Sequence, residues 1–256
     1  MMKLTFIGNG NMAQSLIEGL VHTYEIEVLG RNKESLEALK NLLPQISVKV
    51  LDVKEDISHK NIVLCVKPYS LPTLAPKLAG KANALYSVLA GTTIESISSQ
   101  IDATHYVRTM PNLGASHLKS MTTVTGDEAL KESALEIFNK IGHTLWLDSE
   151  NELDIATGVA GSGPAYLALI AESLADGAVQ QGLKRADAQA LVSGLFDGFA
   201  ALIAHNSPAD IKDGVMSPGG TTAAGYAALE RGNVRNAMIE TVADAYSKAK
   251  ELKTKN

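Results

Sequence analysis

The sequence has little cysteine, few aromatic residues and no block of basic charge. Its single cysteine, Cys65, lies in an apolar run and has no partner within the chain for a disulfide. Aromatic residues make up 5% of the chain, and 23 Lys and Arg stand against 28 Asp and Glu, for a formal net charge of -5. Binding to a nucleic-acid backbone needs a basic patch, so nucleic acid is not an expected partner.

Sequence patterns for metal binding, serine catalysis and export are also missing. The six histidines form no metal-ligand spacing with one another, so no metal is expected. The segment Gly161-Ser162-Gly163 lacks the outer glycines of a nucleophile elbow, because Ala160 and Pro164 stand there. Near the start, Lys3 leads into a short apolar strand and not into the long apolar segment of a secretory signal. A cytoplasmic protein is therefore expected.

The stretch of residues 155–171 carries no charge, but it is not expected to cross a membrane. It contains several glycines and Pro164, and Asp154 and Glu172 close it before the roughly 20 apolar residues that a bilayer requires. A buried helix entered through a Gly-rich turn explains this stretch better.

The first part of the chain alternates β-type runs with helical patterns, which predicts a parallel sheet covered on both faces. The six expected strands cover residues 3–7, 26–29, 47–51, 61–66, 85–89 and 106–109. Two more β-like stretches, 121–125 and 144–147, flank an expected helix at 127–141. They could add edge strands to the sheet, in a direction that the sequence does not give.

After about Asn151, Ala- and Leu-rich stretches at helical spacing predict a second, all-helical domain. The expected fold is therefore α/β, with a Rossmann-like domain at 1–151 followed by a helical domain at 152–256. Apolar residues repeat at helical spacing over 167–178 and 192–203, and a last helix is expected from about Asn233 to Leu252. Thin helices rich in Ala and Gly make a poor core. We therefore expect this domain to complete itself against a second copy of the chain.

A glycine-rich loop follows the first expected strand at once and opens a helix. It reads Gly8-Asn9-Gly10-Asn11-Met12-Ala13. In this context Gly8 permits the tight turn, Gly10 lets the backbone approach a pyrophosphate, and Ala13 lets the helix pack closely on the strand. The N–H groups at the start of the helix face the phosphates. The loop predicts dinucleotide binding; the alternative is a purely structural turn.

The end of the second strand, Gly30-Arg31-Asn32, points to the kind of dinucleotide. No carboxylate is present there to bind the ribose 2′-OH of NAD. The Arg31 guanidinium can bind a 2′-phosphate, and Asn32 can donate a hydrogen bond beside it. NADPH is the expected cofactor, with NADH as a second possibility. The alternative is that Arg31 is a solvated loop cation.

Ligands of open α/β sheets bind outside the carboxyl ends of the strands. The loops expected at this edge are Val66-Lys67-Pro68, Ala90-Gly91-Thr92 and Met110-Pro111-Asn112. Lys67 is expected near the cofactor ribose, and Pro111-Asn112 is expected to place an amide near the nicotinamide. In the alternative interpretation Lys67 is merely solvated and Pro111-Asn112 is only a turn.

A second anion-binding loop is predicted in the helical domain, at Ser217-Pro218-Gly219-Gly220-Thr221-Thr222, before a helix at Ala223. Two glycines followed by two hydroxyl groups suit a substrate carboxylate. The alternative is a plain helix start, with Ser217 as the N-cap and Pro218 in the first turn.

Together these motifs resemble pyrroline-5-carboxylate reductases over nearly the whole chain. The resemblance rests on the phosphate loop, Val66-Lys67-Pro68, Ala90-Gly91, Arg108 to Asn112, Gly161 to Tyr166 and above all Ser217 to Thr222. It implies reduction of 1-pyrroline-5-carboxylate to L-proline, the last step of proline biosynthesis, by hydride transfer from NADPH or NADH to the C=N carbon. It also implies that Ser217, Gly219, Gly220 and Thr221 hold the substrate carboxylate, with Thr222 orienting the imine nitrogen.

The resemblance further implies a homodimer with interleaved helical domains, in which the site lies between one chain's cofactor and helices of the dimer. Members of the family often form pentamers of dimers. One departure concerns the adenosine: some members contact it with an asparagine after the third strand, where this chain reads Asp52-Val53-Lys54.

Two other hypotheses are an NADP-linked reductase of β-hydroxyacids or other imines, and a dinucleotide sensor without catalysis. The second anion-binding loop argues against both.

Overall fold

The computed structural model describes residues 2–52 and 54–253, so Val53 of the Asp52-Val53-Lys54 segment lies outside the described residues. The chain forms two compact units. We call residues 1–162 and 243–256 the sheet unit and residues 163–242 the helical unit. The helices begin near Asn151 as expected, but the sheet unit continues to Ser162 and includes the end of the last helix.

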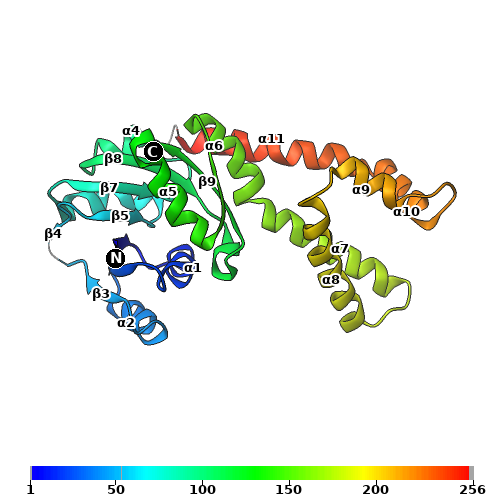
Figure 1. The fold of residues 1–256 in the computed structure, drawn as a ribbon, viewed down its shortest axis with the longest axis horizontal. Helices are drawn as coiled ribbons and strands as arrows, with labels where there is room; N and C mark the ends of the chain where they lie inside the picture. Colours follow the sequence, from blue (N-terminus) through cyan, green and yellow to red (C-terminus); the bar gives the residue numbers. More distant parts are fainter. Residues whose placement is uncertain (1, 53, 254–256) are drawn as a thin grey trace. The chain divides into compact units, whose positions relative to one another are not determined.

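The sheet unit contains an eight-stranded sheet with the order β10-β9-β8-β7-β5-β1-β2-β3 (Figure 1). Its strands are β1 (Lys3–Ile7), β2 (Glu25–Gly30), β3 (Ser47–Val50), β5 (Asn61–Leu64), β7 (Ala82–Ser87), β8 (Ala103–Met110), β9 (Ser120–Gly126) and β10 (Gly142–Trp146). All pairs are parallel except β8 with β9. The six expected strands are confirmed with shifted ends, and the two late strands extend the sheet. A separate two-stranded pair joins β4 (Glu55–Asp56) to β6 (Leu78–Ala79).

Helices lie on both faces of the sheet, as the two apolar layers of the core show. The helices of this unit are α1 (Asn11–Leu20), α2 (Lys33–Leu42), α3 (Leu71–Leu74), α4 (Ile94–Ser98), α5 (Lys131–Phe138) and α6 (Glu150–Ala156). One layer joins Phe6 of β1 to residues of α1, α2 and α5, and the other joins Ile7 to residues of α3 and α4. Phe6 and Ile7 face opposite sides because side chains alternate along a strand. The expected α/β fold is thereby confirmed.

Short helical turns complete the sheet unit. They are the 3-10 turns η1 (Pro68–Ser70), η2 (Ala75–Lys77), η3 (Leu113–His117), η4 (Glu128–Leu130) and η5 (Asn139–Ile141), and the π-helical turn η6 (Thr157–Gly161). The helix expected at 127–141 is therefore divided into η4, α5 and η5. The last residues of α11 (Val234–Lys253) also belong to this unit.

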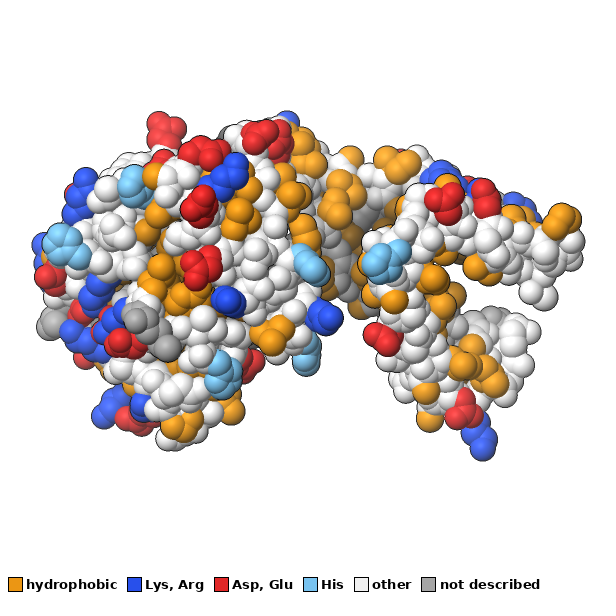
Figure 2. All heavy atoms as spheres, in the orientation of Figure 1, with side chains coloured by type: hydrophobic (Ala, Val, Ile, Leu, Met, Phe, Trp, Pro, Cys, Tyr) orange, Lys and Arg blue, Asp and Glu red, His pale blue; other side chains and the backbone are white. Residues whose placement is uncertain are grey.

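The helical unit holds α7 (Gly163–Gln180), α8 (Arg185–Ile203), α9 (Pro208–Val215), α10 (Thr221–Arg231) and the first part of α11. Only Ala175 and Ala188 are buried among its residues, all of which the structure describes. Large apolar side chains stay exposed on α7 and α8, as Figure 2 shows for the visible face; Leu169 and Leu191 are 63% and 62% exposed. This unit has almost no core of its own.

The expectation for residues 155–171 is wrong in two respects. The Gly-rich segment does not break the helix, because its π-helical turn η6, which contains Gly158 and Gly161, carries the helical path from α6 towards α7. The helix is also not buried: Val159 is 58% and Leu167 is 51% exposed, since no described segment of the same chain covers this face. By length and composition alone, Glu150–Gln180 and Arg185–Ile203 could each cross a membrane.

Candidate functional site

Gly8 forms the turn of the predicted phosphate loop, and only glycine fits there. Its φ is +110°, and an added Cβ would lie 2.4 Å from the carbonyl oxygen of Cys65. Its N–H donates to the carbonyl of Leu29 at 2.8 Å, so the loop passes close to the ends of β2 and β5. A left-handed backbone and a backbone contact this close both exclude a side chain.

Gly10 differs from Gly8 in its surroundings. It is exposed, its φ is -75°, and an added Cβ would meet nothing within 4 Å. The open space next to Gly10 is where a pyrophosphate would approach the backbone. Ala13, by contrast, is 1% exposed and packs in the core, as expected for the residue that seats the helix on the strand.

The N-terminus of α1 is left without a side-chain cap. Gly10 is its N-cap, and its first turn holds no acidic residue. Side chains do cap α2, α4 and α6, through Asn32, Thr93 and Ser149. The first N–H groups of an α-helix have no partner inside the helix and attract anions. Asn11 is exposed and Met12 half-buried at this helix start.

Asn9 supplies a further unsatisfied donor. Its side-chain nitrogen Nδ2 is buried and has no hydrogen-bond partner in the described part of the chain. Its Oδ1 would lie 3.0 Å from a Cβ added to Gly30, which places Asn9 between the phosphate loop and the end of β2. An orphaned donor, an open glycine and an uncapped helix together fit the phosphates of a dinucleotide.

Arg31 and Asn32 follow β2, as expected. Arg31 is exposed and makes no ion pair within the described residues. Asn32 is the N-cap of α2, where its Oδ1 accepts a hydrogen bond from the N–H of Ser35 at 2.8 Å. This cap leaves the amide nitrogen of Asn32 to donate to a ligand. The sequence did not reveal the capping role.

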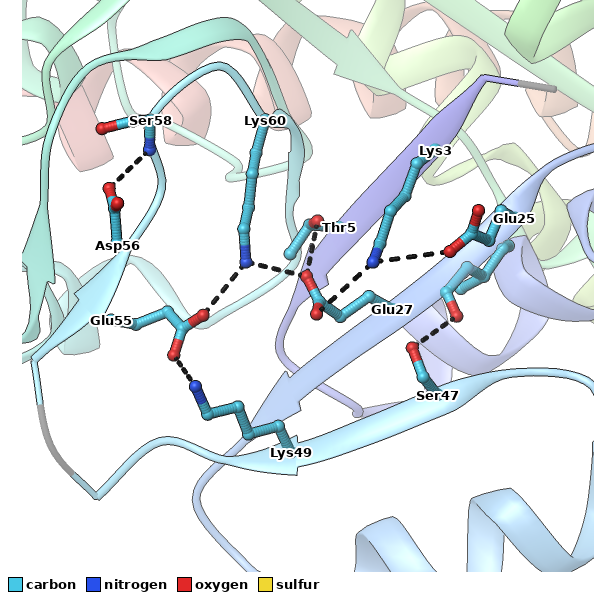
Figure 3. A network of polar contacts seen from close by, with 11 residues as sticks. Lys3, Thr5, Glu25, Glu27, Ser47, Lys49, Glu55, Asp56, Ser58 and Lys60 are labelled. Carbon is cyan, nitrogen blue, oxygen red and sulfur yellow. Dashed lines mark hydrogen bonds and ion pairs between the residues drawn. The ribbon is translucent and has the colours of Figure 1, made fainter.

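The acid nearest to this strand end is used elsewhere. Glu27 lies within β2, where its carboxylate accepts hydrogen bonds from Lys60 and Thr5, both at 2.9 Å (Figure 3). Burial alone would raise the pKa of Glu27, but these hydrogen bonds and the nearby Lys60 charge outweigh it and hold the pKa below its usual value. Glu27 is therefore committed to a charge network and does not supply the acid that NAD-specific sites place at the strand end.

The loops after β5 and β7 lie at the carboxyl edge of the sheet. Lys67 is exposed next to the half-buried Val66 and Pro68. Ala90 is exposed, whereas Gly91 is buried and has a φ of +64°. These positions agree with the expected topology.

The expected position of Asn112 near the nicotinamide stays a prediction, and the structure shows which groups of the chain its amide binds. Its Oδ1 accepts from the N–H of Gly114 at 2.9 Å and its Nδ2 donates to the carbonyl of Ala160 at 2.8 Å. The residue is 9% exposed, and Pro111 beside it is buried. Asn112 therefore ties η3 to the π-helical turn, with both ends of its amide occupied.

Arg108 is a residue whose role the sequence did not reveal. Its side chain is 1% exposed, and it donates to Glu150 at 2.9 Å and to Asp154 at 3.0 Å. A buried charge is stable only when it is paired and hydrogen-bonded. The signal in the sequence was a single arginine inside the strand expected at residues 106–109.

The second predicted anion-binding loop precedes α10. Gly219 has a φ of +72° and open space around it, and the N–H of Gly220 donates to the carbonyl of Ser217 at 3.0 Å. Gly220, and not Ser217, is the N-cap of α10, so the alternative of a helix starting at Pro218 is wrong. Thr221 and Thr222 thus lie in the first turn.

Like α1, helix α10 has no side-chain cap and no acidic residue in its first turn. Ser217 and Thr221 are exposed, and Thr222 is half-buried. In the described part of the chain, no cluster of three or more His, Cys, Asp or Glu could hold a metal ion.

Comparisons with known proteins agree with these features. Residues 150–252 match the family model for pyrroline-5-carboxylate reductase dimerisation, and residues 3–91 match the model for NADP oxidoreductase, coenzyme F420-dependent. The pyrroline-5-carboxylate reductase of Helicobacter pylori strain J99 is 34% identical, covering 96% of this chain and 98% of its own length. That of Synechocystis is 37% identical, covering 98% of each chain.

Solved structures give the same result. The 1-pyrroline-5-carboxylate reductase of Streptococcus pyogenes superposes with a TM-score of 0.85 at 28% identity, covering 98% of each chain. The Plasmodium falciparum pyrroline carboxylate reductase with NADP bound has a TM-score of 0.83 at 26% identity, covering 99% of this chain and 100% of the other. This chain is therefore an oxidoreductase that belongs to the pyrroline-5-carboxylate reductase family.

Proposed function

We propose that the chain reduces 1-pyrroline-5-carboxylate to L-proline with NADPH, the last step of proline biosynthesis. The observation that carries the proposal is a pair of helix starts, α1 and α10, that share two properties. Each follows a glycine-containing loop, and each lacks both a side-chain cap and an acid in its first turn. The start of α1 suits the pyrophosphate of a dinucleotide, and the start of α10 suits the carboxylate of the substrate.

The cofactor residues fall into three groups. The loop from Gly8 to Ala13 holds the pyrophosphate, and Arg31 with Asn32 holds the 2′-phosphate. The remaining contacts come from residues 66–68, 90–91 and 111–112, of which Asn112 acts by holding its loop in place. When bound, NADPH supplies the hydride that reduces the C=N bond. Exposed Arg31 and the commitment of Glu27 to Lys60 support NADPH over NADH.

The substrate residues bind and orient. The N–H groups of Gly219, Gly220 and Thr221 and the hydroxyl of Ser217 hold the carboxylate. A cyclic iminium is already electrophilic, so holding its carbon in a reactive position accounts for several kcal/mol of the rate gain. The hydroxyl of Thr222 donates a hydrogen bond at the imine nitrogen. Threonine is a poor acid, so we assign it an orienting role.

The test of the proposal is the loss of NADPH absorbance when 1-pyrroline-5-carboxylate is added to the purified chain. We expect steady oxidation of NADPH and formation of proline. Other cyclic imines with NADPH, and β-hydroxyacids with NADP, are assayed in parallel. Faster turnover of one of these would replace the substrate assignment, and bound NADPH without turnover of any substrate would indicate a sensor.

A Thr222→Val variant tests the orienting role separately. The change keeps the size of the side chain and removes the hydroxyl. We expect kcat at saturating substrate to fall by about tenfold, because a hydrogen bond of about 1 kcal/mol or more is lost at the reacting nitrogen. The affinity for NADPH should not change. Full turnover of the variant would remove Thr222 from the reaction.

The same proposal includes a homodimer, because residues 150–252 match the dimerisation domain and the helical unit has almost no core. The apolar helices are better covered by a second copy than by lipid. Glu172, Asp176 and Asp197 lie within them, and charges at bilayer depth are costly.

We propose association of dimers into pentamers of dimers and a cytoplasmic location as further parts of this assignment. Mass measurement in solution and cell fractionation test them.

A further inference from the structure

The loop Ala90–Thr93, whose first two residues the proposed function assigns to the cofactor, is held by contacts from other parts of the sheet unit. At its end, the N–H of Ile94 donates to the carboxylate oxygen Oε1 of Glu150 at 3.0 Å. The same oxygen accepts from Nη1 of Arg108 at 2.9 Å. Glu150 therefore connects the end of this loop to the buried arginine of β8.

Arg108 continues the connection to the C-terminal helix. Its Nη2 donates to Oδ1 of Asp154 at 3.0 Å, and the other oxygen of Asp154 forms an ion pair with Lys253. Arg108 and Asp154 are 1% and 2% exposed, and Lys253 is 23% exposed. Two cations and two carboxylates thus balance in one cluster that joins β8, α6 and the end of α11. The cluster lies within the sheet unit.

The end of α11 also packs directly against the loop. A Cβ added to Gly91 would lie 2.6 Å from the Cβ of Leu252. Ala249, one turn earlier, is buried, and the hydroxyl of Tyr246 donates to Oδ1 of Asn151 at 2.6 Å. The loop is therefore bounded by Glu150 on one side and by Leu252 on another.

We propose that the last turn of α11 is a positioning element for the cofactor loop Ala90–Thr93, with Leu252 and Lys253 as positioning residues. This inference rests on the proposed function, because that function makes the loop part of the cofactor site. A loop that contains a left-handed glycine loses conformational entropy when a ligand orders it. Contacts that hold the loop in one conformation before binding reduce this cost and raise the affinity for NADPH.

The first test is calorimetric binding of NADPH to the full chain and to a Lys253→Met variant. The variant keeps the aliphatic stem and removes the ion pair with Asp154. We expect the Kd for NADPH to rise by about three- to tenfold, which is the size of effect expected for the loss of one ordinary hydrogen bond. KM for NADPH should rise with it while kcat stays within about twofold. The matched control is Lys248→Met, which removes an exposed ion pair with Glu251 on the same helix and should leave Kd unchanged.

A second readout does not depend on activity. Binding and ordering are reciprocal, so NADPH should slow the hydrogen exchange of the amides of residues 249–253 as well as those of 90–94. A Leu252→Gly variant, which removes the Cβ that lies against Gly91, should also raise Kd. It provides a second test if Lys253→Met does not fold.

Two results would overturn the inference. One is an unchanged Kd for NADPH in both variants, even if their melting temperatures fall, because the helix end would then only stabilise the fold. The other is protection of 90–94 by NADPH without any protection of 249–253. Failure of the proposed function looks different: if the wild-type chain binds NADPH but reduces no imine, the activity assignment fails and the positioning role stands. A wild-type chain that binds no dinucleotide overturns both.

Discussion

At the scale of single residues, the two glycines of the phosphate loop have separate physical roles. Gly8 needs a left-handed backbone and has the carbonyl of Cys65 against it, whereas Gly10 has an ordinary φ and open space around it. The fold therefore requires glycine at position 8, whereas at position 10 only the proposed dinucleotide would require it. Substitution by alanine can separate these two requirements.

We expect Gly8→Ala to lower the free energy of unfolding by about 2 kcal/mol or more, because the new Cβ is strained and meets backbone. Gly10→Ala should leave stability within about 0.5 kcal/mol but raise the Kd for NADPH by about tenfold or more, because the methyl group occupies the approach of the pyrophosphate. Urea unfolding and calorimetry measure the two effects. Normal NADPH binding by a stable Gly10→Ala protein would contradict the assignment of the loop.

Arg31 is the residue that we propose to carry a preference for NADPH. Removing its guanidinium in Arg31→Ala deletes a hydrogen bond between two charged groups, worth about 1.5–3 kcal/mol. We expect KM for NADPH to rise by about ten- to hundredfold and KM for NADH to change little, since NADH has no 2′-phosphate. The measurement is steady-state kinetics with both cofactors. An unchanged KM for NADPH would leave Arg31 as a solvated cation.

At the scale of elements, a charge network joins the strands β1, β2 and β3 and the short strand β4 (Figure 3). Lys60 pairs with Glu27 at 2.9 Å and with Glu55 at 3.0 Å, and Lys49 also pairs with Glu55. Burial alone would raise the pKa of Glu55, but hydrogen bonds from Lys49 and Lys60 outweigh it and lower the pKa. Burial would lower the pKa of Lys60, but Glu27 and Glu55 outweigh it and raise the pKa.

This network gives the sheet unit a pH dependence. Because the folded-state pKa values of Glu27 and Glu55 lie below the ordinary value of 4.5, their stabilisation is present above that pH and is lost as the pH falls through the folded-state pKa values. The contribution of Lys60, whose pKa is raised, is complete below its ordinary value of 10.5 and is lost as the pH rises through the folded-state pKa.

We expect Glu27→Gln to lower the free energy of unfolding by about 1 kcal/mol at pH 7, with a difference from wild type that shrinks at pH 3. Urea unfolding at the two pH values measures this. The control is Glu25→Gln, whose carboxylate is 61% exposed in its ion pair with Lys3 and should contribute little. A difference that stays constant with pH would show that the Glu27 charge does not stabilise the fold.

At the scale of the whole molecule, the helical unit is incomplete as a single chain. Its two buried residues are both alanines, and many of its large apolar side chains are exposed. Each fully buried leucine contributes about 1.5–3 kcal/mol, so a unit that buries none gains little from the hydrophobic effect. A second copy that covers these side chains would supply the missing core.

We expect the melting temperature to rise with protein concentration, because dimer formation stabilises the folded state by mass action. Leu191→Glu should dissociate the dimer in sedimentation experiments, because it places a charge in the expected interface. The matched control is Leu42→Glu on α2, since Leu42 is equally exposed, at 62%, but lies in the sheet unit. A monodisperse wild-type monomer at micromolar concentration would refute the assignment.

The sequence by itself determined the strands of the sheet, the glycine-containing loops before α1 and α10, and the family. These features depend on local patterns: alternation in strands, helical spacing of apolar residues, and glycines where the backbone needs them. Gly8 and Gly219 illustrate this, because each sits at a left-handed position in its loop. A short stretch of sequence is enough to identify such positions.

The tertiary structure alone decided the antiparallel direction of β9, the exposure of residues 155–171 and the roles of Asn112 and Arg108. Asn112 binds the carbonyl of Ala160, and Arg108 binds Glu150 and Asp154, all far along the chain. A polar residue looks the same in the sequence whether it meets a ligand or a distant part of its own chain. Only the folded chain brings distant residues together and so shows which polar residues bind other parts of the chain.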